Sequence, residues 1–342
     1  MRVRAFACVA ALAASFAAHG DDNPASRYRV LSGPDCAGPQ NIIAEEAREP
    51  LNTTFIRVQH MGDPGTGELL GEVDHEISWD VGEMTGLHVV PFAQRGYRNA
   101  PPPVAASAFQ LACGEAGFFI NSFEFNHAVA VDGAGQSASI ARTLDPWPFA
   151  FENTQSRFFI QASIAVPTSY SPTRVPEAGV TAVSFVYYAV DSKSGTALAH
   201  VIGMLDNRLA GVGGSGNEIL ANDGFTPFAA SPLSAVDGSG RPVKYVEVPA
   251  QSATMRYGET WDEPLLFRAD IPYANFQAML EALKPQSPAM STDPLDYRIA
   301  LFGVLAEVFV GTARGHDVML GGSVRGLTLA RERVERRVGR FR

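Results

Sequence analysis

Apolar and polar residues alternate along much of this 342-residue chain, and that pattern indicates β-strands. Between residues 157 and 166 every second residue is apolar, and the positions between carry Arg157, Phe159, Gln161 and Ser163. Similar runs cover residues 117–132, 182–190, 197–206, 244–248, 265–271, 298–311 and 318–330. Several are apolar on both faces, as inner strands of stacked sheets are. The pattern therefore predicts a mainly β protein built as an antiparallel β-sandwich.

One stretch has a helical period instead. Between residues 272 and 284, Phe276, Met279, Leu280 and Leu283 recur at i, i+3, i+4 and i+7. Pro272 suits the first turn of a helix, and Lys284 followed by a proline suits its end. We expect one short amphipathic helix packed on the sandwich. Residues 211–217 and 237–240 are rich in glycine and read as loops.

The beginning of the chain has the layout of a secretory signal peptide. Arg2 and Arg4 precede an apolar stretch over residues 5–18, which is too short to cross a membrane as a helix. The sequence thus predicts a signal peptide over residues 1–20, no membrane anchor, and a secreted or periplasmic bacterial protein. After it we expect a less regular part over residues 21–115, packed on the sandwich or part of it, a sandwich core over 116–330, and a basic tail over 331–342.

Charge and cysteine content narrow the class of partner. The formal net charge of −9 argues against a nucleic-acid partner, which requires a basic surface. Cys36 and Cys113 remain after the signal peptide, and in an oxidising compartment such a pair predicts a disulfide, with two free buried thiols as the alternative. Neither histidines nor cysteines have the spacing of a zinc site, so no metal or other cofactor is expected.

Common enzyme motifs are absent, but acidic residues suggest two candidates. The chain has no G-x-S-x-G elbow and no P-loop, and its one G-x-G-x-x-G match, at residues 211–216, does not open a helix. Glu72, Asp74 and Glu76 alternate, which resembles the E-x-D-x-E signature of laminarinases and lichenases. That likeness covers five residues, and a solvated acidic strand is the alternative interpretation.

The second candidate depends on the order of elements near the C-terminus. The helix at 272–284, followed by an apolar strand over 297–311 and a closing strand, resembles the end of the jelly-roll endoglucanases of glycoside hydrolase family 12. The resemblance implies a jelly-roll or concanavalin-like sandwich and makes Glu307 the acid/base residue. His200 stands where that family has its nucleophile, so the second carboxylate is open between Glu124 and Asp206. The alternative is that Glu307 is a buried structural carboxylate.

Sugar binding requires aromatic rings for the apolar face of a pyranose and polar groups for its hydroxyls. The predicted rings are Trp147, Trp261, Tyr187 and Tyr188, and the predicted polar contacts are Gln161, His200 and Arg208. Trp147 and Trp261 have the most loop-like neighbours, although Trp and Tyr also bury well in cores. We therefore expect a secreted carbohydrate-binding sandwich whose partner is a poly- or oligosaccharide. A glycan-cleaving enzyme is the alternative, and a structural or adhesive envelope protein is the second alternative.

Overall fold

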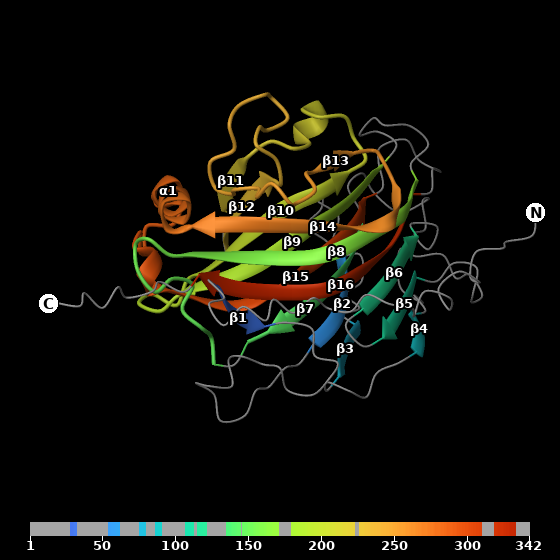
Figure 1. Ribbon diagram of the computed structural model, residues 1–342, viewed down its shortest axis with the longest axis horizontal. Coiled ribbons are helices and arrows are strands. Elements are labelled where there is room, and N and C mark those ends of the chain that lie inside the picture. Colours follow the sequence, from blue (N-terminus) through green and yellow to red (C-terminus); the bar gives the residue numbers. More distant parts are fainter. Residues whose placement is uncertain are drawn as a thin grey trace, which may run out of the picture.

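The computed structural model describes residues 28–32, 54–61, 75–79, 86–90, 107–112, 115–121, 135–144, 146–170, 179–222, 226–309 and 318–332. Within these residues two stacked, mostly antiparallel sheets form a β-sandwich, with an α-helix at one end (Figure 1). The predicted fold class is therefore confirmed. The expected signal peptide, both cysteines of the expected disulfide and the tail beyond residue 332 lie outside the described residues.

The first sheet has seven strands in the order β14-β8-β16-β6-β5-β4, with β1 attached to β16. Its members are β1 (Tyr28–Ser32), β4 (Gly86–Val90), β5 (Ser107–Ala112), β6 (Glu115–Asn121), β8 (Arg157–Tyr170), β14 (Trp261–Pro272) and β16 (Met319–Glu332). All of these pairings are antiparallel. Strand β8 lies between β14 and β16, so it is an inner strand.

The second sheet has nine strands in the order β11-β12-β10-β9-β15-β7-β2-β3, with β13 attached to β10. They are β2 (Thr54–Met61), β3 (His75–Trp79), β7 (Gly135–Thr143), β9 (Val180–Asp191), β10 (Ala197–Asp206), β11 (Ile219–Asn222), β12 (Pro227–Pro232), β13 (Arg256–Tyr257) and β15 (Tyr297–Phe309). The pairings of β10 with β12 and β13 are parallel, and the others are antiparallel. Strands from before residue 115 join both sheets.

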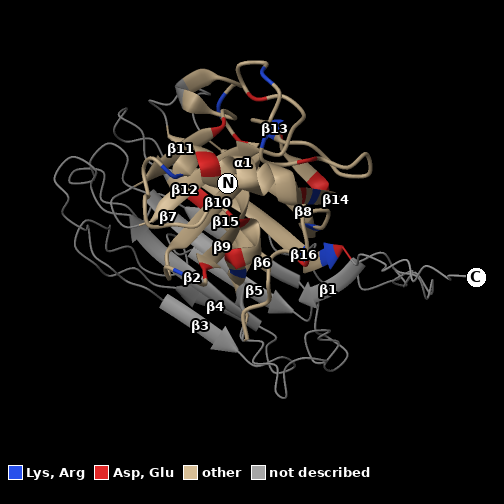
Figure 2. Ribbon diagram, turned by 90° about the vertical axis from the view of Figure 1, so that its left-hand side faces the viewer, with Lys and Arg blue, Asp and Glu red and all other residues tan. Residues whose placement is uncertain are grey.

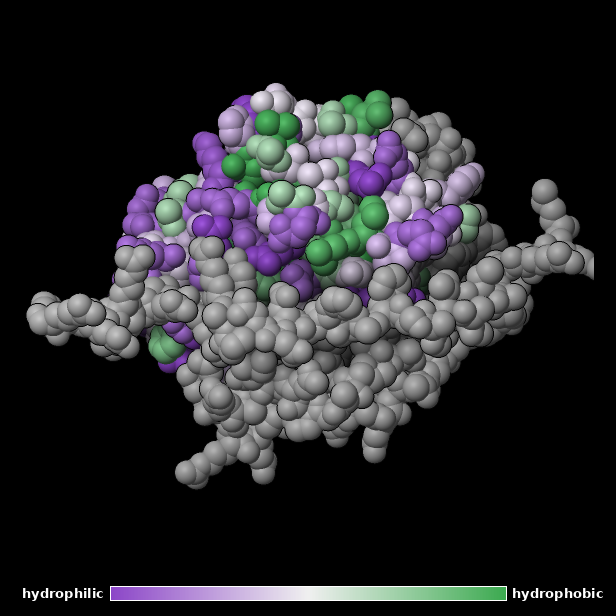
Figure 3. Space-filling model, in the orientation of Figure 1, coloured by the Kyte–Doolittle hydropathy of each residue, from purple (hydrophilic) through white to green (hydrophobic). Residues whose placement is uncertain are grey.

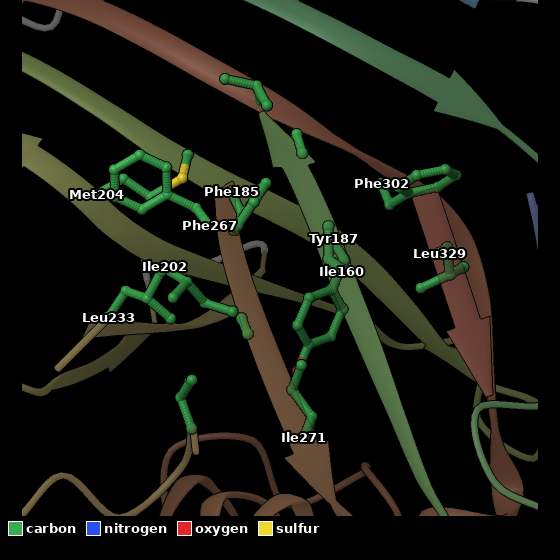
Figure 4. Close-up of a cluster of buried hydrophobic side chains, with 14 of the residues drawn as sticks. Ile160, Phe185, Tyr187, Ile202, Met204, Leu233, Phe267, Ile271, Phe302 and Leu329 are labelled. Carbon is green, nitrogen blue, oxygen red and sulfur yellow. The ribbon is translucent and has the colours of Figure 1, made fainter. Parts of the chain in front are cut away.

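Alternation in β8 determines which residues reach the core. The apolar positions predicted to share a face are all buried: Phe158, Ile160, Ala162, Ile164 and Val166. They meet the inward residues of β9, and the rings of Phe158 and Tyr187 lie 5.2 Å apart in an edge-to-face contact. Figure 4 shows this contact region, with side chains from both sheets pointing between them. The core is therefore the layer between the two sheets.

Helix α1 (Tyr273–Leu283) covers one end of this core, at the end of β14 (Figure 1). Its four periodic apolar residues are fully buried, which confirms the predicted helix and its buried face. The ring of Phe276 lies 5.4 Å from those of both Phe151 and Tyr297. The helix thereby closes the sandwich with an aromatic cluster. Two 3-10 helices, η5 (Val212–Gly214) and η6 (Pro294–Asp296), lie in connections.

Two details of the predicted strand pattern were wrong. Residues 244–248 form no strand and contribute only an isolated bridge between Glu247 and Asp270. The short strands β11 and β12 were not predicted, because β12 begins and ends with proline, which normally interrupts strands. Pro227 and Pro232 are tolerated since β12 runs parallel to β10 and has only short β11 on its other side.

Charged residues cover part of the outward face of the seven-stranded sheet. Arg157 lies within 4 Å of Glu247, Asp270 and Glu332, and the guanidinium of Arg268 stacks 3.6 Å from the ring centre of Phe159. Figure 2 shows acidic and basic residues close together at the end of β16, and Figure 3 shows polar and apolar residues interspersed over the described part of this side. These arginines are used in structural ion pairs.

Candidate functional site

The outward face of the nine-stranded sheet can be assigned from the alternation of its central strands. The inward positions are fully buried: Val183, Phe185, Tyr187 and Ala189 in β9, and Phe302, Val304, Ala306 and Val308 in β15. The residues between them therefore point away from the core. Strand pairing sets Leu301 beside Tyr188, and Glu307 beside Ala182, on this outward face.

Exposed aromatic rings gather where β15 begins. Phe149 forms an antiparallel bridge with Arg298, and Arg298 pairs with Val190 of β9, so these three residues form one row across the sheet. Tyr188 is the next outward residue of β9, and Trp147 precedes Phe149 by two residues. The exposed fractions of Trp147, Phe149 and Tyr188 are 44%, 42% and 38%. We call these three residues the aromatic platform.

Arg298 lies beside this platform. Its guanidinium carbon stands 3.8 Å from the ring centre of Phe149, and its Nη1 donates a hydrogen bond of 3.1 Å to the carbonyl oxygen of Trp147. A backbone hydrogen bond from Ile299 to Pro148 holds the segment of Trp147 and Phe149 against β15. The rings and the cation are therefore attached to a paired strand rather than to a free loop.

Glu307 lies on the same outward face, six residues further along β15 than Leu301. At about 3.4 Å per residue the separation is roughly 20 Å. The Glu307 side chain is half-buried, and desolvation raises the pKa of its carboxyl group from 4.5 to about 7. Among the described residues the carboxyl group has no hydrogen-bond or ion-pair partner, so nothing there offsets this desolvation. A carboxyl group with this pKa can donate a proton near neutral pH.

Asp206 occupies the same cross-strand row as Glu307. Ala182 pairs with Glu307 on one side and with Asp206 on the other, so the two acids are two strand spacings, roughly 9.6 Å, apart at their Cα atoms. Arg208 donates to both carboxylate oxygens of Asp206. The structure thus brings two predicted catalytic residues to one face, while Glu124 lies outside the described residues.

Two of the predicted aromatic contacts are core residues. Trp261 begins β14, is only 8% exposed, and donates its ring N–H to the carbonyl oxygen of Ile164 at 2.6 Å. Tyr187 is fully buried between the sheets. Neither ring can stack on a ligand in this structure. The loop-like interpretation of Trp261 is therefore wrong, because the residue lies in β14.

His200 is also buried in the core. Its Nδ1 lies 2.9 Å from the Tyr187 hydroxyl and its Nε2 lies 3.0 Å from the Ser231 hydroxyl. Burial lowers its pKa from 6.5 to about 3, so the ring is neutral at ordinary pH. One ring nitrogen then donates and the other accepts, and the three residues form a satisfied polar chain inside the sandwich. This geometry does not support the predicted ligand contact by His200.

The remaining predicted polar contacts are also distant from the platform. Gln161 pairs with Arg268 and Thr328 on the outward face of the seven-stranded sheet, which is the opposite side of the sandwich. Arg208 is held by Asp206 near the other end of β10. Of the predicted ligand contacts, Trp147 and Tyr188 are the two that belong to the platform.

Phe149 and Arg298 were not predicted as site residues. Alternation along β15 gave no signal for Arg298, because it has the same parity as the buried residues Phe302 and Val304, and the register shift between Ile299 and Leu301 turns it outward. Its contact with Phe149 also depends on a bridge between segments about 150 residues apart, which alternation cannot reveal. No group of three or more His, Cys, Asp or Glu side chains within the described ranges could hold a metal ion. No helix in that part of the chain is long and apolar enough to span a membrane.

No protein-family model matches the chain, and no curated protein matches it. Among solved structures it is similar to the family 11 xylanase from Neocallimastix patriciarum, with 8% identity, a TM-score of 0.29, and coverage of 72% of this chain and 96% of that chain. It is also similar to the catalytic domain of Humicola grisea Cel12A (9% identity, TM-score 0.30, 64% and 95%). A third likeness is to the adhesin domain of Epf from Streptococcus pyogenes (8%, 0.24, 82% and 63%). Likenesses of this size do not assign an activity.

Proposed function

We propose that this protein binds a poly- or oligosaccharide on the outward face of its nine-stranded sheet, with the aromatic platform as the contact surface. The observation that carries the proposal is the exposure of Trp147, Phe149 and Tyr188 together on one face of a paired scaffold. Large aromatic residues are normally buried, and clustered exposed rings mark binding surfaces. Flat rings offer the apolar contact that one face of a pyranose requires. Export through the predicted signal peptide would bring the protein to such polymers.

Affinity electrophoresis against a panel of neutral and charged polysaccharides tests this proposal. Wild-type protein should be retarded by at least one polymer, and Trp147→Ala and Tyr188→Ala should each migrate faster in that polymer. Tyr170→Ala is the matched control, because Tyr170 is 47% exposed but belongs to β8 of the other sheet. Unretarded wild-type protein across the whole panel would contradict the proposal.

A second candidate function is glycan hydrolysis, and Glu307 is the specific observation in its favour. A general acid needs a carboxyl group that keeps its proton near neutral pH, and the pKa of Glu307 is raised to about 7. Asp206 would supply the second carboxylate, because it lies in the same cross-strand row as Glu307, two strand spacings away at the Cα atoms.

Release of reducing ends from the polymer bound best tests the second candidate. Hydrolysis by the wild type should fall roughly 100-fold or more in Glu307→Gln, because Gln keeps the volume of the side chain and loses its proton donor. Binding by the platform should persist in this variant. Equal hydrolysis by wild type and Glu307→Gln would exclude Glu307 as the acid, and no hydrolysis by the wild type would leave binding as the function.

A further inference from the structure

Arg298 differs from most of the other described arginines because it has no ion-pair partner among the described residues. Six other described arginines each lie within 4 Å of a carboxylate oxygen: Arg157, Arg208, Arg241, Arg256, Arg268 and Arg331. Arg298 has no carboxylate at that distance among the described residues. Among the described residues, the charge of Arg298 therefore has no carboxylate partner, unlike the charges of these six arginines.

The carboxylates near Arg298 are already engaged elsewhere. Asp296 receives Lys193 at 2.7 Å and the hydroxyl of Ser291. Asp191, which pairs across the sheet with Tyr297, accepts the backbone N–H groups of Lys193 and Ser291. These acids are fixed by the hairpin and the turn before β15. They are not available to neutralise Arg298.

The half-buried guanidinium of Arg298 keeps unused donors. A guanidinium has five N–H groups, and the one contact that Arg298 makes from them is Nη1 to the Trp147 carbonyl. Nε and Nη2 have no partner in the described part of the chain, and neither is a sequestered orphan atom. Stacking on Phe149 fixes the plane of the group. Arg298 thus presents a pre-oriented pair of donors at the edge of three exposed rings.

We propose that the polysaccharide bound by the aromatic platform is anionic, and that Arg298 pairs with its acidic groups. The inference rests on the proposed function and specifies its ligand class. A planar guanidinium fork matches a carboxylate or a sulfate ester with two parallel hydrogen bonds, while the rings contact the apolar face of the sugar. A uronic acid residue and a sulfated sugar share this chemistry, so both are candidates. The formal net charge of −9 gives no long-range attraction to an anionic ligand, so the attraction by Arg298 is local.

Titration calorimetry with three oligosaccharides of equal length tests the inference: an oligogalacturonate, a sulfated oligosaccharide and a neutral cello-oligosaccharide. We expect one of the two anionic ligands to bind more tightly than the neutral one, and the preferred one identifies the acidic group. Arg298→Gln should weaken that binding about tenfold, the usual effect of losing a charge-assisted hydrogen bond, and should weaken neutral binding by a smaller factor, because it also removes the cation stacked on Phe149. Arg298→Lys keeps the charge and should retain part of the preference.

Arg256→Gln is the matched control, because Arg256 also lies over an aromatic ring, that of Trp261, but is paired with Glu259. It should bind as the wild type does. Equal affinity for all three ligands, or an anionic preference that survives Arg298→Gln in a folded variant, would overturn the inference while the platform remains a sugar-binding surface. Absence of binding to any of the three and to the wider polymer panel would instead remove the proposed function itself.

Discussion

Arg298 and Phe149 form a cation–π pair at 3.8 Å, on a bridge between β15 and a segment about 150 residues earlier in the chain. The pair joins the start of β15 to the segment of Trp147. It keeps the Phe149 ring beside the cation and fixes the plane of the guanidinium. The outward face of the nine-stranded sheet therefore carries both an apolar and a charged contact at one point.

The two tryptophans described above should respond oppositely to the same substitution. Trp261→Ala should destabilise the protein by about 3–5 kcal/mol, since it removes a buried ring and its hydrogen bond to Ile164. Trp147→Ala should change stability by less than about 0.5 kcal/mol, because the ring is 44% exposed. Urea unfolding of both variants measures the difference. Similar destabilisation by the two substitutions would contradict this assignment of core and surface.

Removal of the Tyr187 hydroxyl should show how much the polar chain of Tyr187, His200 and Ser231 stabilises the core. Tyr187→Phe leaves the Nδ1 of His200 without its partner while keeping the ring contacts with Phe158, so we expect a loss of about 1–3 kcal/mol. Tyr170→Phe, at the end of β8 and 47% exposed, is the control and should lie within about 0.5 kcal/mol of the wild type. Chemical denaturation measures the stability of both variants. Equal midpoints would mean that the polar hydrogen-bonded chain in the core contributes no stability.

Stability should depend on pH through His200 and Glu307 with opposite signs. Burial lowers the pKa of His200 from 6.5 to about 3, so the unfolded state binds the proton first and stability falls as pH drops below 6.5. Desolvation raises the pKa of Glu307 from 4.5 to about 7, so the folded state holds the proton longer and stability falls as pH rises from 4.5 to 7. Between pH 4.5 and 6.5 the two effects cancel.

Single variants should separate the contributions of His200 and Glu307 to the dependence of stability on pH. In Glu307→Gln, stability relative to the wild type should increase by about 1.4 kcal/mol per pH unit between 4.5 and 6.5. In His200→Gln the relative stability should decrease with pH at a similar rate over the same range. Denaturant unfolding at four or five pH values measures both slopes. Parallel curves for the two variants and the wild type would show that neither group is perturbed as described.

Alternation was sufficient to predict most of the sandwich core. The five inward residues of β8 and the four buried residues of α1 follow directly from their periods, because each faces a continuous apolar layer. The same parity placed Glu307 on the face opposite Val308. The prediction failed where strand pairing shifts register. Trp261 precedes such a shift in β14, and it is buried with its ring N–H bonded to the carbonyl oxygen of Ile164.

Adjacent residues of the same type show a second limit of prediction from the sequence. Tyr187 and Tyr188 were both predicted to contact a ligand, yet one is fully buried and the other is exposed. Residue type cannot distinguish them. Tyr187 is two residues from the buried Phe185 and so shares its inward face, whereas Tyr188 points outward. His200 finds Ser231 through the parallel pairing of β10 and β12, a strand that the sequence did not reveal. Long-range pairing therefore decides which polar residues belong to the site.

The affinity of the platform variants for the preferred polysaccharide tests the central claim most directly. Trp147→Ala, Phe149→Ala and Tyr188→Ala, each shown to be folded, should bind that ligand about 3- to 10-fold more weakly in titration calorimetry, as expected for the loss of one stacked ring. Tyr170→Ala should bind as the wild type does. Wild-type affinity in all three platform variants would contradict the account, because the exposed rings would then have no part in binding.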